Sequence, residues 1–323
     1  MRARFLIPTA MLLGSIALAG IGAEFALRWI FRDLTTTSPI ESYFGLRWKK
    51  LHLERNRWGF REREFDLAHP EGVVRIAVIG DSFAVAMGLP EEQRFTNLME
   101  RILNRGGRFE VLQFANPGAE THTEVEILTR FALQAEPDFV LLQWYVNDFE
   151  YTKEGRPSPP RNLIGDPKLH ARIFRSSALY DFLNHAWRSL QLSLGMVTPF
   201  EDYMRERFGD PEGIASRTAM VQLNAFVSRS QRAGVPVGIV LFPRPTARLT
   251  EYPLAFLHER VLAMCELRDI PCLDLTPTYA PYADRMHEIW LNRFDHHPGA
   301  LGHRLAAERI VADFGPIWRR LQR

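Results

Sequence analysis

From Arg75 to the C-terminus, short apolar runs alternate with longer stretches whose apolar residues recur at helical spacing. The short runs predict strands, at residues 75–80, 109–115, 138–144, 236–242 and 272–276. The helical patterns lie at residues 91–104, 121–135, 214–233, 254–267 and 300–312. Strands that alternate with helices in this way predict a parallel sheet with helices on both faces, joined by right-handed crossovers.

A different pattern occupies the N-terminus, where an uncharged apolar run extends over residues 5–23 and follows two arginines. A helix that spans a bilayer needs about 20 apolar residues, so this run is long enough. A signal peptide cleaved at the small residues 17–19 is the alternative. Because the helical pattern continues past Glu24 into aromatic and basic residues typical of a membrane interface, we favour an uncleaved signal-anchor over residues 1–32.

The rest of the chain predicts a connector over residues 33–70 and one domain over residues 71–323. Within the connector, we expect the turn-rich stretch 56–62 to be a surface loop at the edge of the domain. The segment 149–212 interrupts the alternation of strands and helices, with a proline-rich start and an amphipathic part around residues 173–194. It is either a cap over the ligand-binding end of the sheet or a helix packed on the sheet edge.

Composition narrows the choice of partners. The 323 residues carry a net charge of only +2, which gives no argument for a nucleic-acid partner. Two cysteines, Cys265 and Cys272, are too few for a disulfide framework or a zinc site, and they are either paired or two buried thiols. The histidines near the C-terminus lack a metal-ligand set with fixed spacing, so we expect no metal and no cofactor.

Candidate chemistry begins where the first strand runs into Gly80-Asp81-Ser82. Asp81 and Ser82 are also residues that cap helices, so this stretch alone leaves both interpretations open. Gly118 follows the second strand, and Asn147 follows the third. Because parallel strands present their carboxyl ends at one edge of a sheet, we expect these residues to converge there.

The loop at residues 294–303 adds a carboxylate and imidazoles, and it can fold over the same edge. Acyl transfer needs this combination, because a serine hydroxyl is a weak nucleophile without a neighbouring base. Histidine titrates near neutral pH, and a carboxylate fixes its tautomer. The oxyanion that forms needs preorganised donors, which the backbone N–H groups of Ser82 and Gly118 and the side chain of Asn147 can supply.

Four motifs, in this order, resemble the motif blocks of the SGNH (GDSL-type) hydrolase family. They are Gly80-Asp81-Ser82, Gly118, Asn147-Asp148 and Asp295-His296-His297-Pro298. The resemblance covers residues 72–315, and the stretch 56–62 is similar to a Gly-Phe-Arg element of membrane-anchored bacterial members. It implies an α/β fold, a flavodoxin-like three-layer sandwich with a parallel five-stranded sheet of order 2-1-3-4-5.

The resemblance also implies Ser82 as nucleophile, Gly118 and Asn147 as oxyanion donors beside the Ser82 N–H, and an Asp-His pair. We assign Asp295 and His297 to this pair because His297 precedes proline, as in the family; His296 is the alternative. We expect His303 to hold the following helix in place.

Two departures from the family pattern bear on the site. Tyr145 stands where the family usually has glycine two residues before the asparagine, and it is expected to narrow the pocket. The aspartate is two residues before the histidine instead of three. Trp144, Tyr145 and the 149–212 segment are expected to form the walls for the substrate. Arg244, after the fourth strand, is either a ligand for a substrate carboxylate or an exposed loop residue.

These features together predict a serine esterase that removes a small acyl group, with acetyl on a glycan as the preferred substrate. We expect a single-pass protein of the bacterial inner membrane whose catalytic domain faces the periplasm. The substrate is an acylated small molecule or glycan, and the membrane is contacted through the N-terminal helix. The alternatives are an O-acyltransferase that uses the same triad on a polysaccharide and an inactive glycan-binding or assembly factor.

Overall fold

The computed structural model describes residues 3–33, 41–150, 156–246 and 248–322. Its residues form two compact units. We call residues 1–51 with 158–198 the helical unit, and residues 52–157 with 199–323 the sheet unit. Residues 158–198, the middle of the 149–212 segment, belong to the helical unit.

The sheet unit is built on five parallel strands in the order β2-β1-β3-β4-β5. They are β1 (Val74–Gly80), β2 (Phe109–Ala115), β3 (Phe139–Tyr145), β4 (Val237–Phe242) and β5 (Cys272–Asp274). Every residue of β1, an interior strand of the sheet, is buried, as expected for a strand covered on both faces. The prediction of a flavodoxin-like sheet of order 2-1-3-4-5 is confirmed.

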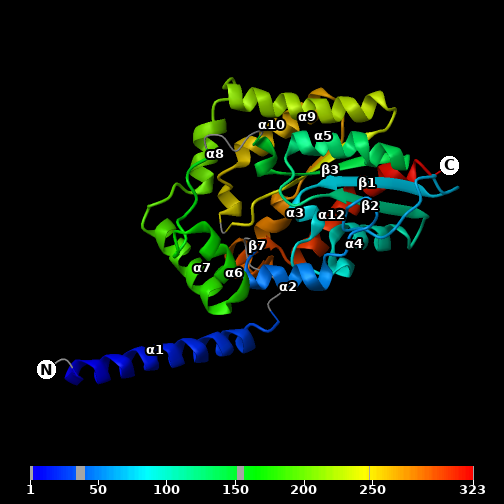
Figure 1. Ribbon diagram of the computed structural model, residues 1–323. Coiled ribbons are helices and arrows are strands. Elements are labelled where there is room, and N and C mark those ends of the chain that lie inside the picture. The colour runs from blue at the N-terminus through cyan, green and yellow to red at the C-terminus, as the bar shows by residue number, and fades with distance from the viewer. Residues whose placement is uncertain (1–2, 34–40, 151–155, 247, 323) are drawn as a thin grey trace. The chain divides into compact units, whose positions relative to one another are not determined.

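Helices cover both faces of this sheet (Figure 1). On one face α4 (Phe95–Leu103) packs against α12 (Ala300–Arg319); on the other, α5 (Thr121–Arg130) packs against α9 (Ile214–Arg232), beside α10 (Ala255–Leu267). The helices lie close to their expected ranges. The 91–104 and 121–135 patterns each include a 3-10 turn, η1 (Glu91–Gln93) and η2 (Ala132–Ala135).

Shorter elements connect these layers at the carboxyl ends of the strands. They are α3 (Ser82–Val85), η3 (Val146–Phe149), α8 (Phe200–Phe208), η4 (Leu249–Glu251), α11 (Thr276–Tyr279), η5 (Ala280–Glu288), β6 (Trp290–Asn292) and β7 (Asp295–Pro298). The last two pair antiparallel as a separate two-stranded sheet. The connections after β1, β3 and β5 thus carry Ser82, Asn147 and the Asp295-His297 pair, while Gly118 and Arg244 follow β2 and β4.

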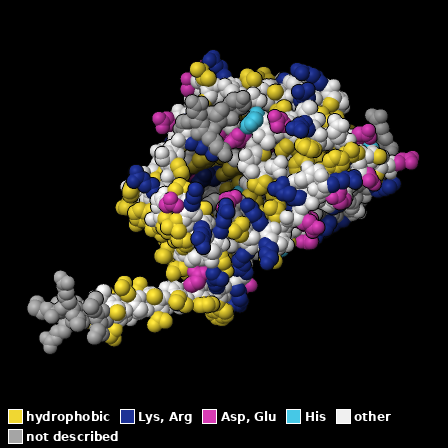
Figure 2. Space-filling view, viewed as in Figure 1, with side chains coloured by type: hydrophobic (Ala, Val, Ile, Leu, Met, Phe, Trp, Pro, Cys, Tyr) yellow, Lys and Arg dark blue, Asp and Glu magenta, His cyan; other side chains and the backbone are white. Residues whose placement is uncertain are grey.

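The helical unit contains α1 (Ala3–Ile30), α2 (Tyr43–His52), α6 (Pro167–Ser176) and α7 (Ala178–Ser193). Residues Pro8–Ile30 of α1 are long and apolar enough to cross a membrane, with a mean hydropathy of 1.8, and the helix is not buried inside the protein. Figure 2 shows its hydrophobic side chains on the surface. Length and composition alone do not separate a membrane span from a signal sequence.

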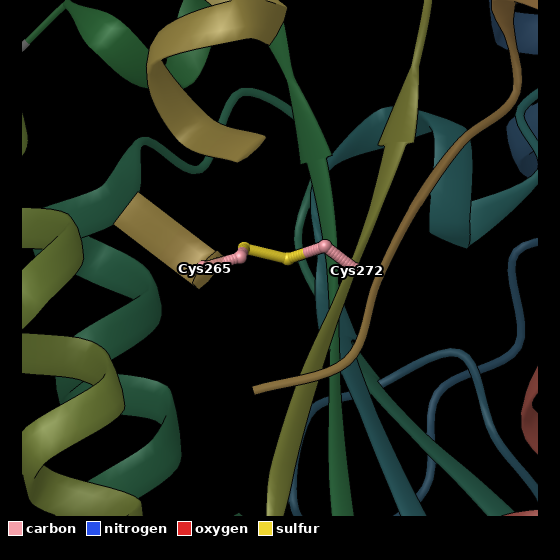
Figure 3. Close-up of a disulfide and its surroundings, with 2 residues drawn as sticks. All are labelled: Cys265 and Cys272. Atoms are coloured by element: carbon pink, nitrogen blue, oxygen red, sulfur yellow. A yellow bond between two sulfur atoms is a disulfide. The ribbon is translucent and has the colours of Figure 1, made fainter. Parts of the chain in front are cut away.

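The two cysteines of the sheet unit are joined by a disulfide (Figure 3). Cys265 lies near the end of α10 and Cys272 begins β5, and their Cα atoms are 6.2 Å apart. The bond therefore closes the short turn between helix and strand. Of the two alternatives that the sequence left open, the structure contains the paired one.

The stretch 56–62 is not the surface loop that we expected. Asn56, Phe60, Arg61 and Glu62 are all buried in the sheet unit. The Asn56 side chain accepts hydrogen bonds from the Trp58 and Phe60 N–H groups, at 3.0 and 3.1 Å, which closes a tight turn. The expectation was wrong because charged residues within a turn look like surface residues unless their partners, which lie far away in the sequence, are known.

Arg61 ties this stretch to the chain around α3. Its guanidinium donates to the carbonyl oxygens of Val85 and Leu89, both at 2.7 Å, and to that of His52 at 2.8 Å. Burial, followed by the charge of Arg94, lowers the pKa of Arg61 to about 10, so the side chain stays charged at neutral pH. It also donates to the carbonyl oxygen of Ala86 at 3.2 Å. A buried cation that bonds these carbonyl groups fixes the chain that follows α3.

A buried ion pair lies next to Arg61. Arg94 donates to the Glu62 carboxylate at 2.7 Å, and the same carboxylate accepts the backbone N–H of Gln113 in β2 at 3.2 Å. Farther along the stretch, Arg55 donates to the Asn116 side chain at 3.4 Å, just after β2 ends. Residues 55–62 therefore brace the chain that leaves both β1 and β2.

We predict that Arg61→Met lowers the free energy of unfolding by about 3 kcal/mol, because the buried carbonyl groups of Val85, Ala86 and Leu89 lose their donor. Urea denaturation of the full chain in detergent measures this. The matched control is Arg63→Met, since Arg63 is 40% exposed and pairs with Glu100 near the surface; such a pair contributes about 1 kcal/mol or less. Equal losses in both variants would contradict the bracing role of Arg61.

Candidate active site

The turn from β1 into α3 sets the position of Ser82. Asp81 caps α3, because its carboxylate accepts the Phe83 N–H at 2.8 Å. The Gln143 side chain in β3 accepts the N–H groups of Asp81 and Ala84, at 3.1 and 3.0 Å. Asp81 is thus the capping residue, while the half-buried Ser82 is the first residue of the helix.

Gly80 is required at this turn by the close approach of β3. A Cβ atom at Gly80 would collide with the Gln143 side chain and lie 3.0 Å from the Gln143 carbonyl oxygen. The Gln143 side chain would have to move to make room for it. The glycine therefore lets the Gln143 amide reach the N–H groups of the turn, which fixes the first turn of α3 and with it Ser82.

Ser82, His297 and Asp295 lie in one hydrogen-bonded line. His297 Nε2 is 2.9 Å from Ser82 Oγ, and His297 Nδ1 is 2.5 Å from Asp295 Oδ1. The same Asp295 oxygen accepts the His297 N–H at 3.1 Å. An imidazole held between a carboxylate and a hydroxyl in this order has the geometry that a serine nucleophile needs.

The extended conformation of β7 explains how Asp295 and His297, only two residues apart, can contact each other through their side chains. Alternate residues of a strand point to the same side, so Asp295 and His297 face together. His296 points away from them and stacks on Trp290, with ring centroids 3.9 Å apart. The geometry therefore supports His297, and not His296, as the partner of Ser82.

The surroundings of His297 and Asp295 shift both pKa values. Burial alone lowers the pKa of His297, but the charge and hydrogen bond of Asp295, with a further contribution from Asp81, outweigh burial and raise it above 6.5. Burial likewise raises the pKa of Asp295, but His297 and its hydrogen bonds outweigh this, and the pKa is lowered. At neutral pH the carboxylate is therefore charged and stabilises a protonated imidazole.

Gly118 lies in a turn next to the β1 end. The Asn116 N–H donates to the Gly80 carbonyl oxygen at 3.2 Å, and the Ala119 N–H closes the turn on the Asn116 carbonyl oxygen at 3.0 Å. Gly118 has a φ of +75°, which suits glycine after proline in a type II turn. It is exposed, and there is open space where its Cβ would be, so a ligand can approach its backbone.

Asn147 lies in η3, directly after β3, and its side chain is a hydrogen-bonding neighbour of Asp81. Burial raises the pKa of Asp81, and the Phe83 N–H, His297 and the Asn147 amide act against that shift. The structure thus brings Asn147 beside the residue that precedes Ser82. Ser82, Gly118 and Asn147 follow three adjacent strands, β1, β2 and β3, as we expected.

Two further buried carboxyl groups, those of Glu124 and Asp148, interact with Asp81. Nothing in the sequence pattern singled out Glu124. Asp148 accepts the Tyr145 N–H at 2.6 Å. Glu124, at the start of α5, has no hydrogen-bond partner for either side-chain oxygen among the described residues. Burial and the nearby charge of Asp81 raise the pKa of Glu124 well above its usual value, and burial with the charge of Glu124 does the same to the pKa of Asp148.

Tyr145 forms an aromatic wall with Phe83. Their rings stack with centroids 4.2 Å apart, and the Phe83 ring lies 5.3 Å from the His297 ring. Burial, ahead of the smaller effects of neighbouring charges, raises the pKa of Tyr145 to about 12, so its hydroxyl is neutral. The ring that replaces the family's usual glycine thus packs on the residue next to Ser82.

Trp144 and Arg244 differ from what we expected of substrate-contacting residues. The Trp144 side chain is fully buried against Phe149 and His258, because it points to the opposite side of β3 from Tyr145. The expectation that it lines the substrate site is therefore corrected. Arg244 is partly exposed and forms an ion pair with Glu201 at 3.0 Å, so any acidic ligand would compete with that carboxylate.

His303 has the structural role that we expected for it. It is fully buried, its ring stacks on Phe95, and its Nδ1 accepts the Phe95 N–H at 3.3 Å. Burial, followed by the charge of Arg94, lowers its pKa to about 3. A neutral imidazole therefore joins α12 to the start of α4.

The chain matches solved structures of several hydrolases. TesA is 14% identical, with a TM-score of 0.47 over 75% of this chain and 98% of that one. The acetyl xylan esterase AlAXEase is 15% identical, with a TM-score of 0.45 over 74% and 98%. A catalytic mutant of Axe2, an acetylxylan esterase from Geobacillus stearothermophilus, is 12% identical, with a TM-score of 0.47 over 75% and 94%. At these identities the likenesses do not assign a substrate.

No curated protein matches the chain. The model of the GDSL-like lipase/acylhydrolase family matches residues 78–305, which is most of the sheet unit and more than half of the chain. The matched region begins within β1 and ends within α12, so it contains the end of β1, all of β2 to β5 and the connections that carry the candidate residues. The chain therefore belongs to the GDSL-like lipase/acylhydrolase family and is an SGNH-type serine hydrolase.

Proposed function

We propose that the protein is an esterase that hydrolyses a small acyl ester through a Ser82-His297-Asp295 triad and an acyl-enzyme intermediate. The observation that carries the proposal is the hydrogen-bonded line of the three side chains, at 2.9 Å and 2.5 Å. An inactive binding factor has no need of this alignment, which makes it the weaker candidate.

In the first step Ser82 Oγ attacks the ester carbonyl carbon while His297 Nε2 accepts the hydroxyl proton. The imidazolium formed is stabilised by Asp295, which holds Nδ1. Collapse of the tetrahedral intermediate breaks the bond to the alcohol, and His297 returns the proton to that oxygen. A water molecule then repeats the sequence on the acyl-enzyme, with His297 again as base, and releases the acid and Ser82.

The oxyanion of each tetrahedral intermediate would be held by the backbone N–H groups of Ser82 and Gly118 and the side-chain amide of Asn147. Removal of one such donor costs about 3 kcal/mol of barrier in well-studied hydrolases. The open space at Gly118 supports this role, because a carbonyl oxygen can approach its N–H without displacing a side chain. The positions of all three residues after adjacent strands support it as well.

A short acyl group, with acetyl as the preferred one, fits the aromatic wall beside the base. Tyr145 packs on Phe83, and Phe83 packs on His297, so rigid rings replace the space that glycine would leave. A glycan is the preferred carrier, because we propose that residues 1–32 are an uncleaved anchor that holds the enzyme in the bacterial inner membrane with its sheet unit in the periplasm. The disulfide supports a periplasmic location of the sheet unit, since disulfides persist in oxidising compartments.

Hydrolysis and acyl transfer to a sugar hydroxyl use the same three side chains, so the choice between them depends on whether water reaches the acyl-enzyme. The His297 side chain is 19% exposed. Solvent therefore contacts the residue that would activate the second nucleophile. This favours hydrolysis over the O-acyltransferase alternative.

We predict that Ser82→Ala lowers the turnover of p-nitrophenyl acetate by at least about 10³-fold, because the nucleophile is lost while the fold is kept. Ser189→Ala, on the exposed side of α7, is the matched control and should keep full activity. Unchanged turnover in Ser82→Ala would end the proposal. Adding an acetylated oligosaccharide and a second sugar acceptor shows whether acetate or a new ester is the product.

We predict that the rate rises with pH as His297 loses its proton, with a midpoint above pH 6.5, because Asp295 raises the pKa of His297. Asp295→Asn removes that charge while burial still lowers the pKa, so the midpoint should shift to lower pH. The rate should also fall by about 10³- to 10⁴-fold, because the tautomer is no longer fixed. The pH dependence of kcat/KM measures both effects.

The matched control for the pH profile is Asp138→Asn. Asp138 pairs with His69 at 2.8 Å, in a similar Asp-His contact that we do not assign to catalysis. This variant should keep the midpoint of the parent protein. An unshifted midpoint in Asp295→Asn would show that Asp295 does not control the protonation of the base.

A further inference from the structure

In the helical unit, α7 packs its polar side inward, which is the reverse of the usual arrangement for a surface helix. Asp181, Asn184 and Gln191 are fully or almost fully buried. Their side-chain oxygens accept the backbone N–H groups of Phe44, Leu163 and Arg161, at 3.2, 3.0 and 2.9 Å respectively. The polar positions of α7 therefore serve as the contacts that hold the unit together.

The opposite side of α7 is apolar and exposed. Leu183 and Leu190 are 45% and 46% exposed, Ala186 lies exposed between them, and Leu194, just after the helix, is 64% exposed. Spacings of three and four residues place all four on one side of a helix. We call them the α7 apolar face; Figure 2 shows hydrophobic side chains over this part of the helical unit. A contiguous apolar face in water marks an interaction surface.

The first turn of α7 is fixed to α1 by Glu24. The Glu24 carboxylate accepts the Ser177 hydroxyl at 2.8 Å and the N–H groups of Ala178 and Leu179 at 3.0 and 2.8 Å. Arg28 bonds both Glu24, at 2.5 Å, and the Ser176 carbonyl oxygen, at 2.9 Å. The one acidic residue of the candidate span therefore caps a neighbouring helix, where its negative charge is stabilised.

This contact sets the level of α7 relative to the membrane. The uncharged run of α1 ends at residue 23, and about 20 residues fill the hydrocarbon core. Glu24 would then lie at the edge of the bilayer, and the first turn of α7 at the same level. The Phe31 and Phe182 rings, stacked with centroids 6.3 Å apart, hold the two helices together beyond this point.

The charge of the α6–α7 segment suits the same surroundings. Residues 158–198 contain five basic residues and two acidic ones, which gives a net charge of +3. The basic residues are Arg161, Lys168, Arg172, Arg175 and Arg188. Of the acidic ones, Asp181 is buried. Basic residues beside an exposed apolar helix face are typical of segments that bind anionic lipid surfaces.

We propose that the α7 apolar face lies in the surface of the bilayer that α1 spans, with anionic phospholipid as its partner. The proposal rests on the anchoring role of α1 that we proposed above. The 158–198 segment is then a membrane-bound platform that extends the anchor, which explains why a helix would turn its leucines outward and its amide and carboxylate groups inward.

The test uses the full chain in vesicles of phosphatidylethanolamine and phosphatidylglycerol. Because the native cysteines form a disulfide, an environment-sensitive fluorophore can be attached at Leu190→Cys, or at Leu194→Cys beyond the end of the helix. Brominated lipid should quench either label at least twofold, and the emission should shift to the blue. The matched control is Leu267→Cys, 87% exposed in α10 of the sheet unit, whose label should not be quenched.

A carbonate wash separates the two proposals. If the protein stays with the vesicles but the labels at 190 and 194 remain unquenched, the platform proposal is overturned and the anchor proposal is kept. Chain that the wash releases contradicts the anchor, and the platform falls with it. A blue shift that bromine does not quench, and that grows with the ratio of protein to lipid, shows that a second copy covers the face and also overturns the proposal.

Discussion

The hydrogen bond between Ser82 Oγ and His297 Nε2 joins two residues that are 215 positions apart, and the proposed chemistry depends on it. One partner is held at the end of a fully buried strand, the other on a short strand near the C-terminus. Its geometry depends on Gly80, because a side chain there would displace the Gln143 amide that holds the turn. It also requires the extended backbone of β7, which turns Asp295 and His297 to one side.

Buried charges surround this bond, and their arrangement explains how the protein tolerates them. Arg61 and Arg94 are compensated by carbonyl groups and by Glu62 on the side of β1 and β2. Asp81 keeps donors for its carboxylate, and burial with the charge of Asp81 raises the pKa of Glu124. Ionised groups without partners would be costly in this interior. Because the other buried groups are paired or have shifted pKa values, the main charge interaction beside Ser82 is the one between Asp295 and His297.

The sequence predicts the parallel sheet and its neighbouring helices well, because β1, β3 and β4 are almost entirely buried and their short apolar runs have the length and the β-branched and aromatic residues of strands. The sequence places Ser82, Gly118 and Asn147 together because parallel strands end at one edge, and the choice of Asp295 and His297 rests on the resemblance to the family. The role of Arg61 could not be found, since its partners are backbone carbonyl groups that have no sequence signature. Glu124 resembles any polar residue of an amphipathic helix. In α7 the polar side chains are buried and the leucines are exposed, so the apolar spacing of this helix marks its exposed side and not the side that faces the core.

The central claim is that His297 and Asp295 activate Ser82, and a fluorophosphonate probe tests it most directly because only an activated serine reacts. The full chain would be labelled near pH 8, digested and mapped by mass spectrometry. The account predicts one adduct, on the peptide that contains Ser82, and much slower labelling after Asp295→Asn. An adduct on a different serine, or no adduct on a folded chain, would contradict the claim.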